Sequence, residues 1–269
     1  MNKKIISMIG MVLILLIVGC TTTQNKVTTI QEQVEIGAAF PLTGGLALYG
    51  DMAEKSAQLA AEDYNIKLNV QDHECNSKTA VSVFKQLQAK GVKIFTSAAC
   101  SGTVLSVAPQ LEGGKGLWLG TLVSTPKITG VSDYVFRNWA SDGKESKLFA
   151  EEILAAGYNK VGVIYEQTDY AEGLKISLEK YLEGTDVTIV SEGFTKESTD
   201  VRSQLSKLIE EDIEVLFISP QTTIAGDIVL KELSELGFEP ELLIVNDNIL
   251  KSKDLRSRYS DLLDGAIGG

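Results

Sequence analysis

Histidine is almost absent from this chain, whose 269 residues include a single one, His73. A metal site built from histidines is therefore excluded, and a Ser-His-Asp catalytic site would depend wholly on that residue. His73 lies in the polar stretch QDHEC at 71–75, which favours a position on the surface. The sequence thus argues against enzymes and metalloproteins that rely on histidine.

Other catalytic and nucleotide-binding motifs are also missing. The chain has no G-x-S-x-G elbow, and no G-x-G-x-x-G follows a predicted strand. Gly45 and Gly50 have the spacing of a phosphate-binding loop, but Asp51 follows where that loop requires lysine. Acidic clusters such as 210–212 are typical of a solvated surface. We predict a protein that is not an enzyme and that uses neither a metal nor a cofactor.

Positive charge is scarce. The chain has 25 Lys and Arg against 36 Asp and Glu, a formal net charge of −11. Without residues 1–19, which hold two lysines and no acidic residue, the net charge is −13. Binding to nucleic acid requires clustered Lys and Arg to neutralise phosphates, so we predict no nucleic-acid partner.

An apolar run of 14 residues, 5–18, follows Lys3 and Lys4 and ends at Gly19-Cys20. This length suits the core of a signal peptide and is short for a membrane span. A small residue before a cysteine is the requirement of lipoprotein signal peptidase, so residues 1–19 are predicted as a signal peptide and Cys20 as the lipidated N-terminus. The alternatives are an ordinary secretory signal or an uncleaved anchor helix.

Residues 20–33 form a polar stretch that suits a solvated tether between lipid and domain. We therefore expect an exported protein with a membrane-lipid partner at Cys20. It would be anchored to the outer face of the cell membrane or lie in the periplasm.

Two further cysteines, Cys75 and Cys100, remain after Cys20 is assigned. An even number of thiols in an oxidising compartment permits a disulfide. Two buried free thiols are the alternative, and the residues alone do not decide between them.

From residue 34 onward, strand-like apolar runs alternate with amphipathic segments of helical spacing. The runs are 34–40, 66–70, 92–97, 117–121, 161–165, 187–190, 215–218 and 242–245, and the helical segments are 52–64, 80–88, 147–156, 174–182, 201–209 and 228–236. Residues 198–200 precede one helix as caps, and Gly91 and Gly237 end others. Such alternation predicts an α/β fold with parallel sheets covered on both faces.

The alternation is interrupted between 122 and 142, where a connection with a short extended piece at 134–137 replaces a helix. A long connection between two α/β sets predicts a hinge between two lobes. We expect the first lobe at 34–131, the hinge at 132–141 and the second lobe at 142–264. In such folds ligands bind at the carboxyl ends of the strands.

Two hydroxyl-bearing loops follow adjacent predicted strands, at 99–103 and 123–126. Hydroxyls and free backbone N–H groups at a helix start hold anions, so these loops are candidates to clamp one carboxylate. The alternative is that Ser101 caps a helix and that residues 124–126 form a turn.

The chain resembles the leucine/isoleucine/valine-binding family of ABC-transporter solute receptors, which has the type 1 periplasmic-binding fold. The resemblance runs from about residue 34 to the last residue. It rests on segments that occur in the family's order: IGAAFPLTGGLALYGD (36–51), AAEDYN (60–65), QDHECNSKTAV (71–81), SAACSGT (97–103), STPKIT (124–129), FR (136–137) and YEQTDYAEGL (165–174). It implies two Rossmann-like lobes with parallel sheets and a hinge, and it implies a disulfide between Cys75 and Cys100, which some members form.

The resemblance also implies roles for individual residues. Ser101, with Gly102 beside it, matches the serine that holds the ligand carboxylate. Leu122 matches a position whose backbone carbonyl meets the ligand ammonium, and Ser124 stands where the family commonly has threonine. Asp247 falls near the family's acidic partner for the ammonium group.

Aromatic positions show both agreement and departure. Tyr49 and Tyr170 match aromatic residues that line the cleft. Gln221 and Thr222 replace aromatic residues often found in the second lobe, and Ala171 stands where glycine is usual. These departures argue against a strictly branched aliphatic ligand and leave room for a more polar one.

The resemblance implies a binding protein that captures a small polar solute, such as an amino acid, between its lobes and delivers it to an ABC permease. The alternative is a receptor of the same fold that senses an amide, urea or amino acid and acts on a signalling partner. Family chains continue beyond residue 269 to complete both lobes. We therefore expect 265–269 to start a crossover back to the first lobe, and the sequence to be a fragment.

Overall fold

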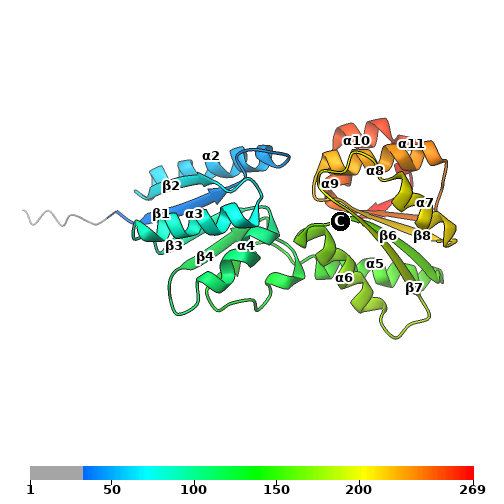
Figure 1. The fold of residues 1–269 in the computed structure, drawn as a ribbon, viewed down its shortest axis with the longest axis horizontal. Helices are drawn as coiled ribbons and strands as arrows, with labels where there is room; N and C mark the ends of the chain where they lie inside the picture. The colour runs from blue at the N-terminus through cyan, green and yellow to red at the C-terminus, as the bar shows by residue number, and fades with distance from the viewer. Residues whose placement is uncertain (1–32) are drawn as a thin grey trace, which may run out of the picture. The chain divides into compact units, whose positions relative to one another are not determined.

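The computed structural model describes residues 33–269, and residues 34–269 form one compact unit. The predicted signal peptide, Cys20 and all of the tether except Gln33 lie outside the described residues. Two parallel five-stranded sheets organise the unit, and each defines a lobe (Figure 1). The predicted α/β class and the parallel sheets are therefore confirmed.

The first lobe contains the sheet with strand order β2-β1-β3-β4-β5. Its strands are β1 (Glu35–Phe40), β2 (Lys67–Asp72), β3 (Ile94–Ala98), β4 (Leu117–Thr121) and β5 (Val135–Arg137). Its helices are α2 (Ala47–Asp63), α3 (Ser77–Ala89) and α4 (Ser101–Val107), with 3-10 turns η2 (Ala108–Gln110) and η3 (Pro126–Ile128). The sequence analysis placed residues 135–137 in the hinge, but Val135–Arg137 pairs with β4 as an edge strand. The prediction missed this strand because three residues are too few to give a periodic pattern.

The second lobe contains the sheet with strand order β10-β9-β8-β6-β7. Its strands are β6 (Lys160–Glu166), β7 (Thr188–Phe194), β8 (Val215–Ser219), β9 (Leu242–Val245) and β10 (Ile267–Gly268). Its helices are α5 (Gly143–Ala156), α6 (Asp169–Leu182), α7 (Arg202–Glu210), α8 (Thr223–Leu236), α9 (Asp247–Leu250), α10 (Lys253–Arg258) and α11 (Ser260–Leu263). Residues 267–268, predicted to start a crossover, pair with β9 in this sheet.

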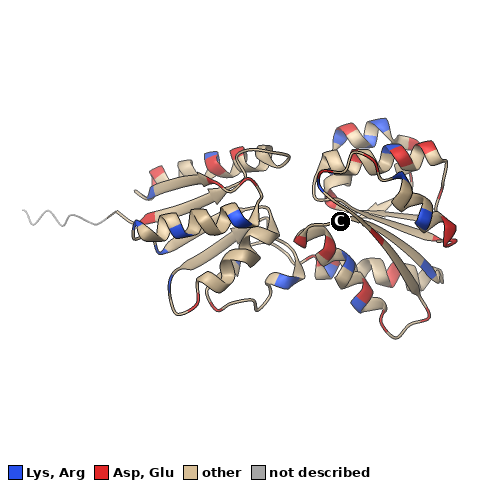
Figure 2. Cartoon of the chain, in the orientation of Figure 1, with Lys and Arg blue, Asp and Glu red and all other residues tan. Residues whose placement is uncertain are grey.

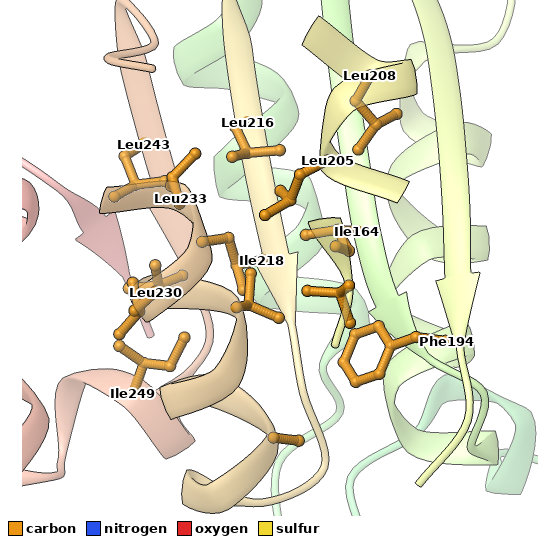
Figure 3. Packing of buried hydrophobic residues seen from close by; sticks show 14 of the residues in the cluster. Ile164, Phe194, Leu205, Leu208, Leu216, Ile218, Leu230, Leu233, Leu243 and Ile249 are labelled. Atoms are coloured by element: carbon orange, nitrogen blue, oxygen red, sulfur yellow. The ribbon is translucent and has the colours of Figure 1, made fainter. Parts of the chain in front are cut away.

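Alternating strand residues fill cores on both faces of the second sheet. Ile164, Leu216 and Ile218 pack against α7 and α8, whereas Val163 and Phe217 pack against α5 and α6. Figure 3 shows the first of these cores, with side chains of β8 and β9 meeting leucines of α7 and α8. This sheet is covered on both faces, as an all-parallel sheet requires.

The first sheet is covered less completely than the sequence predicted. Helices α3 and α4 bury one face, where Phe95 stacks on Trp118 and Phe84 packs against Phe95 at a tilt. On the other face α2 covers β1 and β2, while apolar side chains of β3, β4 and β5 remain 37–51% exposed: Ile94, Leu117, Leu119 and Phe136. Among the described residues no helix packs over this part of the sheet.

The helix ends agree in part with the predicted caps. Gly237 is the C-cap of α8 with φ +62°, and Gly91 follows α3 with φ +92°, a conformation that glycine adopts without a steric cost. Helix α7 has Val201 rather than one of residues 198–200 as its N-cap. Asp200 still accepts a hydrogen bond from the N–H of Arg202 at 2.9 Å, so it caps the helix from one position earlier.

Charged residues of both signs are interspersed along the helices (Figure 2). Many are paired across one helical turn, as Lys147 is with Glu151 and Lys175 with Glu179. Exposed pairs of this kind contribute little to stability, about 0.3–0.5 kcal/mol each.

His73 is not at the surface, contrary to the prediction. Its side chain is fully buried, and its Nδ1 accepts the N–H of Cys75 at 3.1 Å. Burial lowers its pKa to about 4, so the ring is neutral at pH 7. The polar neighbours in the sequence gave no sign of this, because they are themselves half-buried or exposed while the His73 side chain alone is fully buried.

Candidate functional site

A cavity of about 540 Å³ lies at the carboxyl ends of strands from both sheets. In the first lobe its walls come from the segments after β1, β3, β4 and β5. In the second lobe they come from α5, from the segments after β6, β8 and β9, and from residues 267–269. Both sheets reverse their strand order at one point, between β1 and β3 and between β6 and β8. Crevices at such reversal points are the usual binding sites of open α/β sheets, and here two of them border one cavity.

The loops after β3 and β4 have unusual backbone conformations. Ala99, Cys100 and Leu122 have φ between +56° and +57°, and all three line the cavity. Residues other than glycine pay about 1–3 kcal/mol for such angles, which are typical of functional loops. A disulfide between Cys75 and Cys100 ties the first of these loops to the segment after β2. The pairing implied by the family resemblance is therefore present.

Ser101 and Ser124 are brought together, one from each hydroxyl loop. Both are buried, and the N–H of Thr125 donates to Ser101 Oγ at 3.4 Å. Ser101 Oγ accepts in this bond, which leaves its proton able to donate to a ligand. The Ser124 hydroxyl is hydrogen-bonded to the carboxylate of Asp142. The backbone N–H of Asp142 in turn donates to the carbonyl oxygen of Ser124 at 3.0 Å.

Arg137 of β5 holds the second hydroxyl loop in place. Its Nη1 donates to the carbonyls of Ser124 at 3.2 Å and Thr125 at 2.9 Å, and its Nη2 donates to Thr129 Oγ1 at 2.8 Å. The planar guanidinium fixes three acceptors at once. The edge strand β5 thus serves to position this loop.

On the second lobe, Tyr170 at the start of α6 and Asp247 at the start of α9 meet across 77 residues of sequence. The Tyr170 hydroxyl donates to Asp247 Oδ1 at 2.9 Å, and Lys251 Nζ pairs with Asp247 Oδ2 at the same distance. Burial and the charge of Asp247 raise the pKa of Tyr170, which therefore remains a donor. Both carboxylate oxygens of Asp247 have partners within the protein.

Glu166, at the end of β6, fixes the loop after β8. Its carboxylate accepts the N–H of Gln221 at 2.7 Å and lies 2% exposed. Burial raises the pKa of Glu166, and hydrogen bonds from the backbone of Gln221 and Thr222 oppose this. These hydrogen bonds hold the backbone of Gln221 and Thr222 in the loop after β8.

Seven of the nine residues predicted from the sequence line the cavity: Tyr49, Ser101, Leu122, Ser124, Tyr170, Gln221 and Asp247. Gly102 and Thr222 do not. The Thr222 hydroxyl instead accepts the N–H of Ala225 at 3.1 Å as the N-cap of α8. Gly102 faces Asp169, since a Cβ at this position would lie 2.6 Å from Asp169 Oδ2.

Sequence reasoning missed an acidic group at the start of α5. Asp142 and Glu145 line the cavity, and burial is the largest cause that raises their pKa values, to about 6 and about 8. Acidic residues in the first turn of a helix normally stabilise its positive end while exposed to water. That ordinary role hid the burial of these two, and no sequence pattern distinguishes the two situations.

The fold and cavity define a class: a two-lobed α/β protein whose ligand site lies where the strands of both lobes end. A family model for periplasmic binding proteins matches residues 33–265, and the chain belongs to this family. Its similarity to solved structures supports the same fold. The leucine-binding protein LivK of Thermotoga maritima superposes with a TM-score of 0.74 at 19% identity, covering 86% of this chain and 67% of that one.

Relatives by sequence are distant and longer. Leu/Ile/Val-binding protein homolog 3 of Brucella melitensis is 24% identical over 260 residues, covering 90% of this chain and 67% of the relative. The leucine-, isoleucine-, valine-, threonine- and alanine-binding protein of Pseudomonas aeruginosa is 23% identical over 225 residues, covering 79% and 60%. The chain thus spans about 60–67% of the length of these relatives.

The fatty acid ABC transporter substrate-binding protein of Thermomonospora curvata also superposes with a TM-score of 0.74, at 18% identity, covering 88% of this chain and 63% of that one.

Within residues 33–269, no helix is both long enough and apolar enough to cross a membrane. The same residues contain no group of three or more His, Cys, Asp or Glu side chains placed to hold a metal ion.

Proposed function

We propose that this protein is an extracytoplasmic solute-binding protein that captures an amino acid in the cavity between its lobes and delivers it to an ABC permease. One observation carries the proposal. A single cavity joins the strand ends of both lobes and brings buried hydroxyls together with carboxylates. An amino acid needs both kinds of group, donors for its carboxylate and acceptors for its ammonium.

The donor side of the site lies in the first lobe. Ser101 retains a proton to donate, and its loop is held by the disulfide at Cys100 and by Thr125. Preorganised donors of this kind replace the water that a buried carboxylate loses. The acceptor side is the carboxylate group contributed by α5 and α9.

The choice of an amino acid rather than another solute draws on the relatives. Those from Brucella and Pseudomonas are named for aliphatic amino acids, whereas a structural neighbour is named for fatty acids. A fatty acid carries no ammonium to pair with the carboxylates of Asp142, Glu145 and Asp247. The charge of the cavity therefore favours the amino acid.

Transport also requires a location outside the cytoplasm. The apolar run at 5–18 and the Gly19-Cys20 pair support export followed by lipid attachment at Cys20. Tethering to the membrane would keep the binding protein close to its permease.

The experiment that tests the proposal is calorimetric titration of the full chain with a panel of amino acids, small amides and urea. We expect Ser101→Ala to weaken the bound amino acid by about tenfold to a hundredfold, because a hydrogen bond to a charged group contributes about 1.5–3 kcal/mol. Ser106→Ala is the matched control, since this serine of the same helix bonds to Ser77 O and Thr103 O away from the cavity. Failure of every amino acid to bind, or equal affinity in Ser101→Ala, would contradict the proposal.

A further inference from the structure

Four carboxylates line the cavity: Glu152 is exposed, and the other three differ in how they are paired. Asp247 is satisfied by Tyr170 and Lys251. Asp142 is only 9% exposed, and its Oδ2 has no hydrogen-bond partner. Glu145 has a buried Oε1 without a partner, while its carboxylate accepts a backbone hydrogen bond from Gly269. Two acidic side chains of the cavity are therefore left without a counter-charge.

The cations nearest to these side chains do not neutralise them. Across the described residues, no Lys or Arg lies within ion-pair distance of Asp142 or Glu145. Lys251 is committed to Asp247, Lys144 is exposed, and Arg137 directs its nitrogens to backbone carbonyls and to Thr129. A buried carboxylate without a partner is costly, so this arrangement points to a cation supplied from outside the chain.

The perturbed pKa values agree with this geometry. Burial raises the pKa of both groups, and the mutual repulsion of Asp142, Glu145 and Asp247 raises the pKa of Glu145 further. A positive group placed between them would stabilise their ionised forms and lower both pKa values.

The cation is an organic group rather than a metal. The described residues offer no set of three ligands for a metal ion. The cavity instead combines its carboxylates with apolar side chains, among them Leu46, Leu148 and Phe149. Such walls suit a methylene chain that ends in a charged nitrogen.

We propose that the ligand carries a second cationic group besides its α-ammonium, and that Glu145 is the residue that selects it. This inference rests on the proposed function, because it assigns a side chain to the amino acid bound there. Asp142 is the N-cap of α5 and Glu145 lies in its first turn, three residues later, so their Cβ atoms are about 5–6 Å apart. Asp142, beside Ser124, faces the amino-acid end of the ligand, and Glu145 faces the end of its side chain. Diamino acids such as ornithine and lysine have this spacing of charges.

Two matched pairs test the inference: norleucine against lysine, and norvaline against ornithine, titrated into the full chain. Each pair differs by the terminal ammonium alone. We expect at least one of the two cationic members to bind more than tenfold tighter than its neutral partner. Glu145→Gln should reduce that preference by about tenfold to a hundredfold and leave the neutral member unchanged within threefold. Glu152→Gln, an exposed acidic residue at the same cavity on the same helix, should retain the preference.

The outcomes separate the inference from the proposed function. Equal affinity for the two members of both pairs, or an unchanged preference in Glu145→Gln, would overturn the inference and leave an amino-acid-binding protein. Absence of binding by every amino acid would overturn both. Circular dichroism of the variants establishes that they are folded. Because Asp142 is proposed to meet the α-ammonium, which all four ligands carry, Asp142→Asn should weaken the binding of all four.

Discussion

At the scale of single residues, the acidic side chains of α5 are the most unusual feature of the second lobe. Glu145 has a pKa of about 8 and Asp142 of about 6, against ordinary values of 4.5 and 3.8, and burial is the main cause of both shifts. Asp247 adds repulsion at both groups, and Lys251 opposes it. Both groups therefore ionise at a higher pH than usual, and a positive charge placed in the cavity would lower both pKa values.

This arrangement predicts how stability depends on pH. Because its folded-state pKa is raised, Glu145 contributes stability that is present below about pH 4.5 and is lost as the pH rises through about 8. We expect Glu145→Gln to flatten the decline of the melting temperature between pH 5 and pH 8 in ligand-free protein. Thermal unfolding of wild type, Glu145→Gln and Glu152→Gln across this range is the measurement.

His73 must be separated from this effect. Its pKa is lowered to about 4, so it contributes stability in the opposite direction, rising with pH between about 4 and 6.5. The contribution of His73 is common to all three proteins and cancels when the curves are subtracted. A Glu145→Gln curve parallel to that of the wild type would show that Glu145 ionises normally in the folded state.

At the scale of elements, the contact between η3 and α6 joins the two lobes. The Thr125 hydroxyl donates to Asp169 O at 3.1 Å, and Lys127 pairs with Glu172 at 2.8 Å. Helix α6 approaches this loop so closely at Gly173 that a Cβ there would lie 2.1 Å from Thr125 Oγ1. The same loop carries Ser124 and follows Leu122, so its position sets the geometry of the cavity.

We therefore expect Gly173→Ala to weaken ligand binding by tenfold or more, although alanine is the better helix former by about 1 kcal/mol. The added methyl group would displace Thr125 and with it the second hydroxyl loop. Calorimetry on Gly173→Ala and on the exposed control Ile176→Ala measures the effect. The double variant Gly173→Ala/Thr125→Ala lacks Thr125 Oγ1, the atom that the added methyl group would meet, and should regain part of the affinity. If Gly173→Ala alone binds like the wild type, the loop can shift without changing the geometry of the cavity, and the prediction is wrong.

Elements were predicted well where they touch a core and poorly at their first turns. β4 and β9 have the predicted bounds, whereas α2, α5, α6 and α8 each begin four or five residues earlier than the apolar periodicity indicated. A helix shows periodicity only where one face packs on the sheet. The first turns of α2, α5 and α6 face the cavity instead, and they carry Tyr49, Glu145 and Tyr170.

At the scale of the whole molecule, the two sheets place their strand ends around one cavity, while the first sheet leaves part of one face exposed. β4 shows the contrast within a single strand, since Trp118 is fully buried and its neighbours Leu117 and Leu119 are 41% and 37% exposed. We predict that the location of the protein is set by a different part of the chain, residues 1–20.

Cys20→Ala should abolish lipid attachment, because the proposed modification requires the thiol of this residue. Metabolic labelling of the expressing cells with a fatty-acid analogue, followed by membrane fractionation, measures the loss. Thr21→Ala is the neighbouring control and should be labelled like the wild type. Equal labelling of the Cys20→Ala and wild-type proteins would exclude a lipid anchor at this position.

The alternating α/β architecture and the two hydroxyl loops could be predicted from the sequence alone, because they depend on local information: apolar periodicity within one element, or a motif of a few residues. The family could also be predicted, from segments that occur in its order along the chain. The order of the strands, the place of β5, the burial of His73 and the partial burial of Glu145 were decided by tertiary structure. So was the bond between Tyr170 and Asp247, which lie 77 residues apart. Burial and electrostatic coupling arise from groups brought together by folding, and a polar or acidic residue looks the same in sequence whether water or a cavity surrounds it.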